Sequence, residues 1–166
     1  MKKFILEHAI SPTDIDFKEA IGKEKWLEKR NELIIKFEYQ CQGCGIYMPK
    51  NNKHLRLHVI NGSIDDLENV EYTILCPACH LVQHIDLAEE KGLIKLVNSI
   101  YSQAELIRLG RSKVVANEIS KEKRIIMLEK TPKEYIEELK QSVLNRKNKI
   151  KIILSKNFDW STSTDC

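Results

Sequence analysis

Long apolar runs are missing from this 166-residue sequence, and so is a complete signal-peptide core. The first dozen residues, MKKFILEHAISP, begin basic and turn apolar, but Glu7 and His8 interrupt the run too early for a secretory signal. No stretch approaches the roughly 18 consecutive apolar residues that a membrane span needs. We therefore expect no membrane span, and a location in the cytoplasm or at the cytoplasmic face of a membrane complex.

A strong excess of one charge is also missing. The chain has 27 Lys and Arg against 24 Asp and Glu, which leaves a net charge of +3. Nucleic-acid-binding domains usually carry a clearer basic excess on one face. The composition alone therefore gives no argument for a nucleic-acid partner, and the mixed charge indicates solvated helix faces.

Cysteine is scarce, with five in the chain, but four of them form two closely spaced pairs, Cys41-x-x-Cys44 and Cys76-x-x-Cys79. In a chain without an export signal, such cysteines are more often metal ligands or free thiols than disulfides. Tetrahedral zinc accepts four thiolates and then has no position left for a substrate. The sequence therefore predicts a structural zinc at these four residues, whereas Cys166 matches no pair and is expected to be a free thiol.

Three of the histidines are placed where they could converge. His80 and His84 stand four residues apart, so they share one face of a helix that begins near Cys79 and can chelate a single ion. His58 lies on an alternating strand that enters the Asn-Gly turn signal at residues 61–62. These imidazoles could bind a second divalent metal. The alternative is that His80 and His84 are exposed or capping residues on a helix that only serves the zinc site.

Helix signals occur at several places along the chain. Apolar residues at helical spacing predict a helix over residues 23–36, which leads into the first cysteine pair. The helix that carries His80 and His84 is expected to continue after His84, through residues 85–91, and to stop at Gly92. Ser102 and Glu105 form a capping-box pattern, and the run Thr-Pro-Lys-Glu at 131–134 repeats it with proline at the first helical position. The apolar stripe behind residue 134 packs either on the protein's own core or on another protein.

Lysines alternate with isoleucine and leucine between residues 146 and 156. This tail could be an edge strand that is charged on one side. It could also be a segment that folds onto a partner, with Phe158 and Trp160 as anchors. We expect residues 1–100 to form a zinc-binding core with an N-terminal helix, and residues 101–166 to form a helical C-terminal extension with a basic and apolar tail.

The runs "LHVING", "LENV" and "LCPACH" resemble a known group of enzymes, the HNH or ββα-metal endonucleases. The usual family run is Leu-His-His-Ile-Asn-Gly, then Leu-Glu-Asn, then Leu-Cys-Pro-x-Cys-His. The resemblance implies an α+β fold with a small zinc-stabilised HNH-like ββα core, similar to a treble clef, flanked by N- and C-terminal helices.

The resemblance also implies roles for individual residues. It makes His58, His80 and His84 ligands of a divalent metal, and it makes Asn69 the residue that orients the general base. Val59 takes the place of the histidine that activates water in the family, and valine cannot accept a proton. A positioned base contributes roughly 10²- to 10⁴-fold to a rate. A shifted register would make His58 the base at the cost of a metal ligand, so an active enzyme would depend on His58 and Asn69.

A second resemblance extends from residue 1 to about residue 110. The runs "FILEHAISP", "KRNELIIKFEYQCQGCG", "HVINGSIDDLENV" and "SIYSQAEL" follow the order and rough spacing of the IcmJ (DotN) component of Dot/Icm type IVB secretion systems. That family is understood as a zinc-containing, HNH-like fold that has lost catalytic residues and sits on the coupling ATPase. The resemblance implies protein partners in a larger complex.

Three hypotheses follow from these patterns. The first is a zinc-stabilised, catalytically impaired scaffold or adaptor in a multiprotein assembly such as a secretion coupling complex. The second is an active, metal-dependent HNH endonuclease that cuts DNA. The third is a zinc module that binds nucleic acid without chemistry, for which only the lysines near the C-terminus argue.

Overall fold

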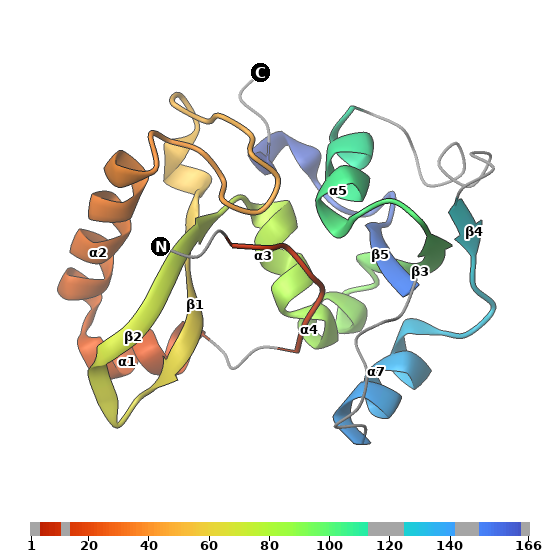
Figure 1. Ribbon diagram of the computed structural model, residues 1–166, viewed down its shortest axis with the longest axis horizontal. Helices are drawn as coiled ribbons and strands as arrows, with labels where there is room; N and C mark the ends of the chain where they lie inside the picture. The colour runs from red at the N-terminus through yellow and green to blue at the C-terminus, as the bar shows by residue number, and fades with distance from the viewer. Residues whose placement is uncertain (1–3, 11–13, 113–124, 142–149, 164–166) are drawn as a thin grey trace.

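Two small antiparallel sheets and the helices around them make a mixed α+β fold (Figure 1). The computed structural model describes residues 4–10, 14–112, 125–141 and 150–163. The elements of the first part are α1 (Asp14–Ile21), α2 (Lys23–Lys36), η1 (Asn52–His54), β1 (Arg56–Ser63), β2 (Asp66–Leu75), α3 (Pro77–Gln83) and α4 (Ile85–Glu90). The remaining ones are β3 (Ile94–Ser99), α5 (Gln103–Arg111), β4 (Ile125–Met127), α7 (Pro132–Gln141), β5 (Ile150–Leu154) and η2 (Trp160–Ser163).

The first sheet is a hairpin in which β1 and β2 pair from Arg56↔Leu75 to Ser63↔Asp66. The register shifts after Val59 and again after Asn61, so the hairpin is irregular near the Asn-Gly sequence. Helix α3 follows β2 directly, and α2 lies on the opposite side of the hairpin (Figure 1). The order strand, strand, helix places the end of β2, the start of α3 and the middle of β1 close together.

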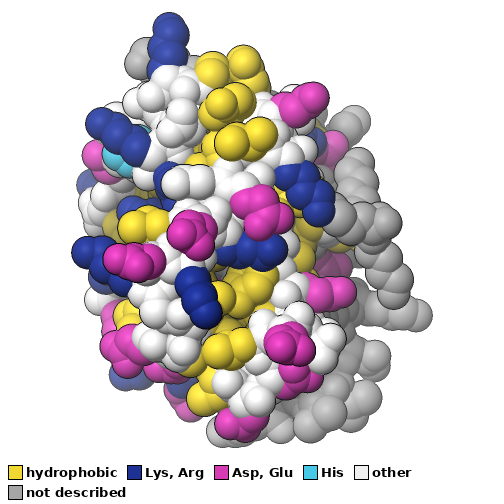
Figure 2. Space-filling model, turned by 90° about the vertical axis from the view of Figure 1, so that its left-hand side faces the viewer, with side chains coloured by type: hydrophobic (Ala, Val, Ile, Leu, Met, Phe, Trp, Pro, Cys, Tyr) yellow, Lys and Arg dark blue, Asp and Glu magenta, His cyan; other side chains and the backbone are white. Residues whose placement is uncertain are grey.

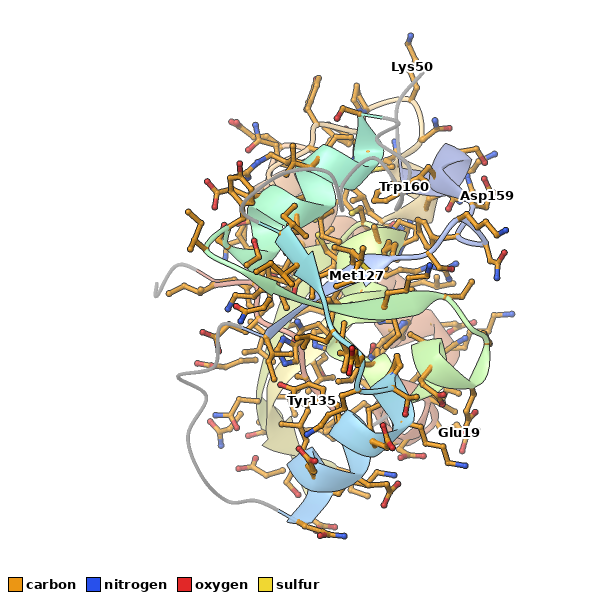
Figure 3. The ribbon with its side chains drawn as sticks, turned by 90° about the vertical axis from the view of Figure 1, so that its right-hand side faces the viewer. Glu19, Lys50, Met127, Tyr135, Asp159 and Trp160 are labelled. Atoms are coloured by element: carbon orange, nitrogen blue, oxygen red, sulfur yellow. The ribbon has the colours of Figure 1, made fainter. Side chains whose placement is uncertain are left out.

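The second sheet has the strand order β4-β3-β5, and both pairings are antiparallel. Helix α5 lies on one side of β3 and α7 lies on the other (Figure 3). The buried side chain of Gln103 in α5 bridges to β5, because its amide donates to the Ile152 carbonyl at 2.6 Å and its oxygen accepts from the Ile152 amide at 3.0 Å. The strand order places β5, which lies in the described part of the lysine- and isoleucine-rich tail, at an edge of this sheet.

Local helix signals give the observed helix starts. Helix α2 has the predicted bounds, and α5 begins with the complete capping box of Ser102 and Glu105. At α7, the Thr131 hydroxyl and the Glu134 carboxylate make the same reciprocal bonds. Tyr135 and Ile136 of α7 are buried in the larger core, so the described part of this stripe packs on the protein itself.

The larger core joins residues from both halves of the chain. It includes Leu6 and Phe17 near the N-terminus, Met48 beside the first cysteine pair, and Ile152 in β5. Strand β3 precedes residue 100 and β5 follows it. Residues 1–100 and 101–166, which were expected to form two separate parts, therefore contribute strands to one sheet. The C-terminal part, expected to be helical, also contains the strands β4 and β5.

The helix expected to run through His84 is interrupted there, which corrects the sequence-based expectation. His84 has φ −131° and ψ 59° and separates α3 from α4. The N-terminal segment fills the break, because the Ala9 amide donates to the Val82 carbonyl at 2.9 Å and the Ile85 amide donates to the Ala9 carbonyl at 3.2 Å. In the part of the chain that the structure describes, no helix has the length and apolar character needed to cross a bilayer.

Candidate metal centres

The four paired cysteines come together in what we call the cysteine cluster, which consists of Cys41, Cys44, Cys76 and Cys79. The first pair follows α2, Cys76 follows β2 as the N-cap of α3, and Cys79 lies in the first turn of α3. The four sulfur atoms lie within 4.8 Å of one another, and those of Cys44 and Cys76 are 3.9 Å apart. Tetrahedral zinc with Zn–S bonds of about 2.3 Å places its sulfurs about 3.8 Å apart. The cluster therefore has the composition and size of a zinc site.

Burial of the cluster makes a thiolate without a compensating cation costly there. All four cysteines are buried. Hydrogen bonds from the other three thiols lower the pKa of Cys44, whereas burial and hydrogen bonds to its neighbours raise the pKa of Cys79. Without a bound cation, the four cysteines therefore differ in how readily each loses its proton. A zinc ion would bind all four as thiolates and remove this difference.

Backbone and helix contacts shape the cysteine cluster. A Cβ atom at Gly43 would lie 2.9 Å from the Cys79 sulfur, so only glycine leaves room for this ligand. The Cys76 amide donates to the Cys41 sulfur at 3.1 Å. Arg111 of α5 donates to the sulfurs of Cys44 at 2.9 Å and of Cys76 at 3.4 Å. A zinc ion with four thiolates has a net charge of −2, and Arg111 would offset part of it. No sequence signal marks this arginine.

A second group, the histidine cluster, consists of Asp14, His58, His80 and His84, whose ligand atoms also lie within 4.8 Å of one another. One Asp14 oxygen, Oδ2, lies 2.6 Å from His80 Nε2, 3.2 Å from His58 Nδ1 and 3.3 Å from His84 Nε2. The three histidines predicted from the sequence therefore do converge. Asp14, at the start of α1, was not predicted.

Asp14 is held in this position as a carboxylate. Its burial would raise its pKa, but hydrogen bonds with His58, His80 and His84 outweigh that effect and hold the pKa well below its usual range. The second carboxylate oxygen, Oδ1, accepts from the Val59 backbone amide at 3.0 Å. Burial lowers the pKa of His80, which favours the neutral imidazole that a metal requires. The cluster can chemically bind one divalent cation through three nitrogens and one oxygen.

The Val59 side chain does not point toward the histidine cluster. Neighbouring residues on a strand face opposite sides of a sheet, and directly paired residues share a side. Val59 pairs with Tyr72, whose ring packs edge-on against Trp26 of α2 at 6.1 Å between centroids. His58 instead packs against His80 of α3 at 5.4 Å between centroids. Position 59 therefore faces α2, and His58 faces α3.

Asn69 does not contact His58. It is exposed near the hairpin tip, and its amide donates to the Asp66 carboxylate at 2.8 and 3.1 Å. His58 Nδ1 faces Asp14 instead. The orienting role that the resemblance gives to Asn69 thus has no supporting contact among the described residues. His8 Nε2 lies 2.8 Å from the Tyr135 hydroxyl, and Cys166 lies outside the described residues.

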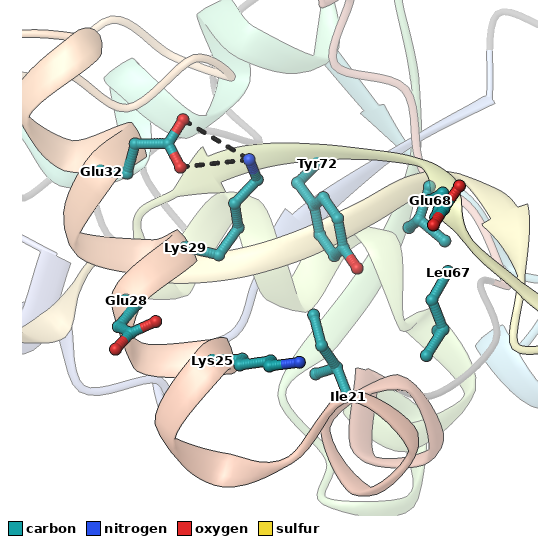
Figure 4. A pocket seen from close by; sticks show the side chains of 9 residues that line it. Ile21, Lys25, Glu28, Lys29, Glu32, Leu67, Glu68 and Tyr72 are labelled. Carbon is teal, nitrogen blue, oxygen red and sulfur yellow. Dashed lines mark hydrogen bonds and ion pairs between the residues drawn. The ribbon is translucent and has the colours of Figure 1, made fainter.

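A surface groove of about 290 Å³ lies between α2 and β2 (Figure 4). Its lining residues are Ile21, Lys25, Glu28, Lys29, Glu32, Leu67, Glu68, Val70 and Tyr72. The face of the molecule that contains α2 displays apolar side chains among charges of both signs (Figure 2). The Tyr72 hydroxyl is buried and has no hydrogen-bond partner among the described residues. The groove therefore combines apolar surface with charges of both signs.

Comparison with known proteins assigns the chain to no family. No protein-family model matches the chain, and no curated protein shows significant similarity to it. The cysteine cluster, the histidine cluster and the groove between α2 and β2 are therefore the features that indicate a function.

Proposed function

We propose that this protein is a zinc-stabilised, HNH-like scaffold or adaptor that is catalytically impaired and acts in a multiprotein assembly such as a type IV secretion coupling complex. The observation that carries this proposal is the orientation of position 59. A residue there faces α2, on the opposite side of the hairpin from His58. In the HNH endonucleases this position holds the general base. Here it holds an apolar residue, and its side chain is directed away from the proposed metal ligands.

The surroundings of the histidine cluster support the same proposal. The side chains of His58 and His84 are 1% and 6% exposed, and that of Asp14 is 12% exposed. A phosphodiester needs direct access to the metal in order to be polarised by it. The most exposed ligand is His80, at 26%. Access for a DNA backbone is correspondingly restricted while α1 stays in place.

An active nuclease is the second candidate, and one observation favours it. His58, His80 and His84 converge as the ligands of a catalytic metal would. A bound ion could polarise phosphate and lower the pKa of its water even without a separate base. The position of Asp14 among these nitrogens argues against such a water, because it fills the space where the fourth ligand would bind.

We expect Val59→His to leave the protein without metal-dependent nuclease activity. The new imidazole would be buried toward α2 and would not reach the histidine cluster. An unsatisfied buried polar group costs about 1 to 3 kcal/mol, so the variant should be less stable than wild type. Cleavage of supercoiled plasmid with Mg²⁺, Mn²⁺, Ni²⁺ or Zn²⁺ and the midpoint of urea unfolding measure both effects.

Val59→Leu is the matched control, because it changes packing without adding a polar group. A gain of cleavage in Val59→His that disappears in Val59→His/His84→Ala would contradict the proposed orientation. It would show that position 59 faces the metal ligands and that only the base is missing.

The groove between α2 and β2 is the surface we assign to a protein partner. Leu67 and Val70 line the groove and offer apolar contact. Lys29 and Glu32, which pair at 3.1 Å on its rim, provide charges of both signs. Such a surface suits a protein segment with apolar and mixed charged side chains better than the uniformly negative backbone of a nucleic acid.

Leu67→Glu is expected to reduce recovery of the partner complex at least about tenfold, since burying an unpaired charge at an interface costs several kcal/mol. The tagged full-length chain is purified from the cells that produce it, and a secretion-type ATPase or its complex is quantified by mass spectrometry. Ile64→Glu is the control, because Ile64 is 49% exposed and lies outside the groove. Recovery of nucleic acid without any protein complex would contradict the adaptor function.

A further inference from the structure

We propose that Asp14 is the fourth ligand of a second metal centre and that this centre is closed, so that its ion fastens the N-terminal segment to the zinc core and does not act on a substrate. The proposal deepens the proposed function, because it assigns a structural role to the histidine cluster. It rests on the geometry of four side chains from three separate parts of the chain.

The distances fit a tetrahedral ion. Zinc bonded to nitrogen and oxygen at about 2.0 to 2.1 Å places neighbouring ligand atoms about 3.3 Å apart. Asp14 Oδ2 lies 3.2 Å from His58 Nδ1 and 3.3 Å from His84 Nε2. The 2.6 Å separation from His80 Nε2 is shorter, and an ion bound between the two atoms would move them apart. All four donor atoms lie within 4.8 Å of one another, which is close enough for one cation to bind them all.

The carboxylate is oriented for one bond to the ion. Its Oδ1 atom accepts from the Val59 amide at 3.0 Å, which leaves Oδ2 directed at the three nitrogens. Hydrogen bonds of this kind fix ligand orientation in metal sites, and losing them typically costs 10- to 100-fold in affinity. With three histidines and one carboxylate, tetrahedral zinc has no vacant position for water or phosphate.

The ion would join the N-terminal segment to the hairpin and helix. Asp14 is 44 residues from His58 and 70 residues from His84 in sequence. Besides Asp14, this segment is attached by backbone bonds of Ala9 to Val82 and Ile85 and by the burial of Leu6 and Phe17. A metal bond at Asp14 would add a fixed point at the start of α1, directly over β1.

Cobalt substitution in the full-length protein tests whether the second metal centre has a vacant coordination position. We expect wild type to bind two Co²⁺ ions, one with the thiolate charge-transfer absorption of a four-cysteine site and one with only the weaker d–d bands of a nitrogen and oxygen site. Because the second centre has no vacant position, azide should leave the d–d bands of wild type unchanged. In Asp14→Ala the vacant position should accept azide, and the affinity for the second ion should fall by at least about 10- to 100-fold.

Glu19→Ala, an exposed acidic residue of the same helix, is the control and should behave as wild type. Asp14→Asn, which keeps the shape of the side chain, replaces Asp14→Ala if that variant does not fold. One ion per wild-type chain, or an azide-induced change in the wild-type bands, would overturn the closed centre. Neither result bears on the loss of catalysis, which the cleavage assays measure separately.

Discussion

Cys76→Ser is expected to leave no folded, zinc-loaded protein. Cys76 is fully buried and supplies both a cluster ligand and the residue that joins β2 to α3. Structural zinc contributes on the order of 10 kcal/mol of apparent binding free energy. This is comparable with the roughly 5 to 15 kcal/mol by which whole domains are stable. Loss of one zinc ligand would therefore remove most of the free energy that keeps the β1–β2 hairpin and α3 folded.

Far-ultraviolet circular dichroism and elemental analysis of the purified variant measure the result. Cys166→Ser is the control, because Cys166 belongs to neither cysteine pair, and it should retain about one zinc at the cysteine cluster. A Cys76→Ser protein that is folded and still loaded with zinc, or wild type that folds without zinc, would remove the basis for a structural zinc site.

Ending the chain after Lys130 is expected to unfold the whole domain. Among the described residues, the deletion removes five buried apolar side chains, those of Tyr135, Ile136, Ile152, Ile153 and Leu154. Truncating one buried isoleucine or leucine to alanine costs about 2 to 5 kcal/mol. The summed free-energy cost of removing all five side chains exceeds the free energy of unfolding of a typical domain. The deletion also removes β5, the partner of β3 along the segment from Ile94 to Asn98.

A graded version of the same test uses single substitutions. Ile152→Ala should lower the free energy of unfolding by about 2 to 5 kcal/mol, while Lys156→Ala, at an exposed position, should change it little. A folded, zinc-binding fragment that ends at Lys130 would show that the zinc core is independent of the second sheet. The shared core of the two halves would then contribute little to stability.

Features encoded within a few residues of one another were predictable from the sequence. The two Cys-x-x-Cys pairs identified the cysteine cluster, because a two-residue gap fixes the separation of the sulfurs. Ser102 with Glu105 fixed the start of α5 in the same way, since a capping box involves only four residues. Histidines 80 and 84 also converge with His58, although the helix that carries them breaks at His84.

Contacts between distant segments were not predictable. Asp14 lies 66 residues from His80, and an aspartate that follows Ser-Pro-Thr reads as an ordinary helix start. The interruption at His84 likewise depends on pairing with Ile10. Arg111 reaches the cysteine sulfurs only because α5 folds back onto them.

The direction of Val59 could have been obtained from the sequence. Leu55, Leu57 and Val59 alternate with His58, and alternation places the apolar residues on one side of the strand and the histidine on the other. The resemblance to nucleases places positions 58 and 59 in one site. In the structure the alternation holds at these two residues, and the register shift begins only after Val59.

The most direct test of a catalytically impaired scaffold is the nuclease activity of the wild-type protein itself. Metal-loaded wild type is incubated with supercoiled plasmid in the presence of Mg²⁺, Mn²⁺, Ni²⁺ or Zn²⁺, and nicked and linear products are quantified against His58→Ala. We predict that wild type and His58→Ala give the same background level of nicking. Efficient cleavage by wild type that is abolished in His58→Ala would contradict the account and establish the protein as an active nuclease.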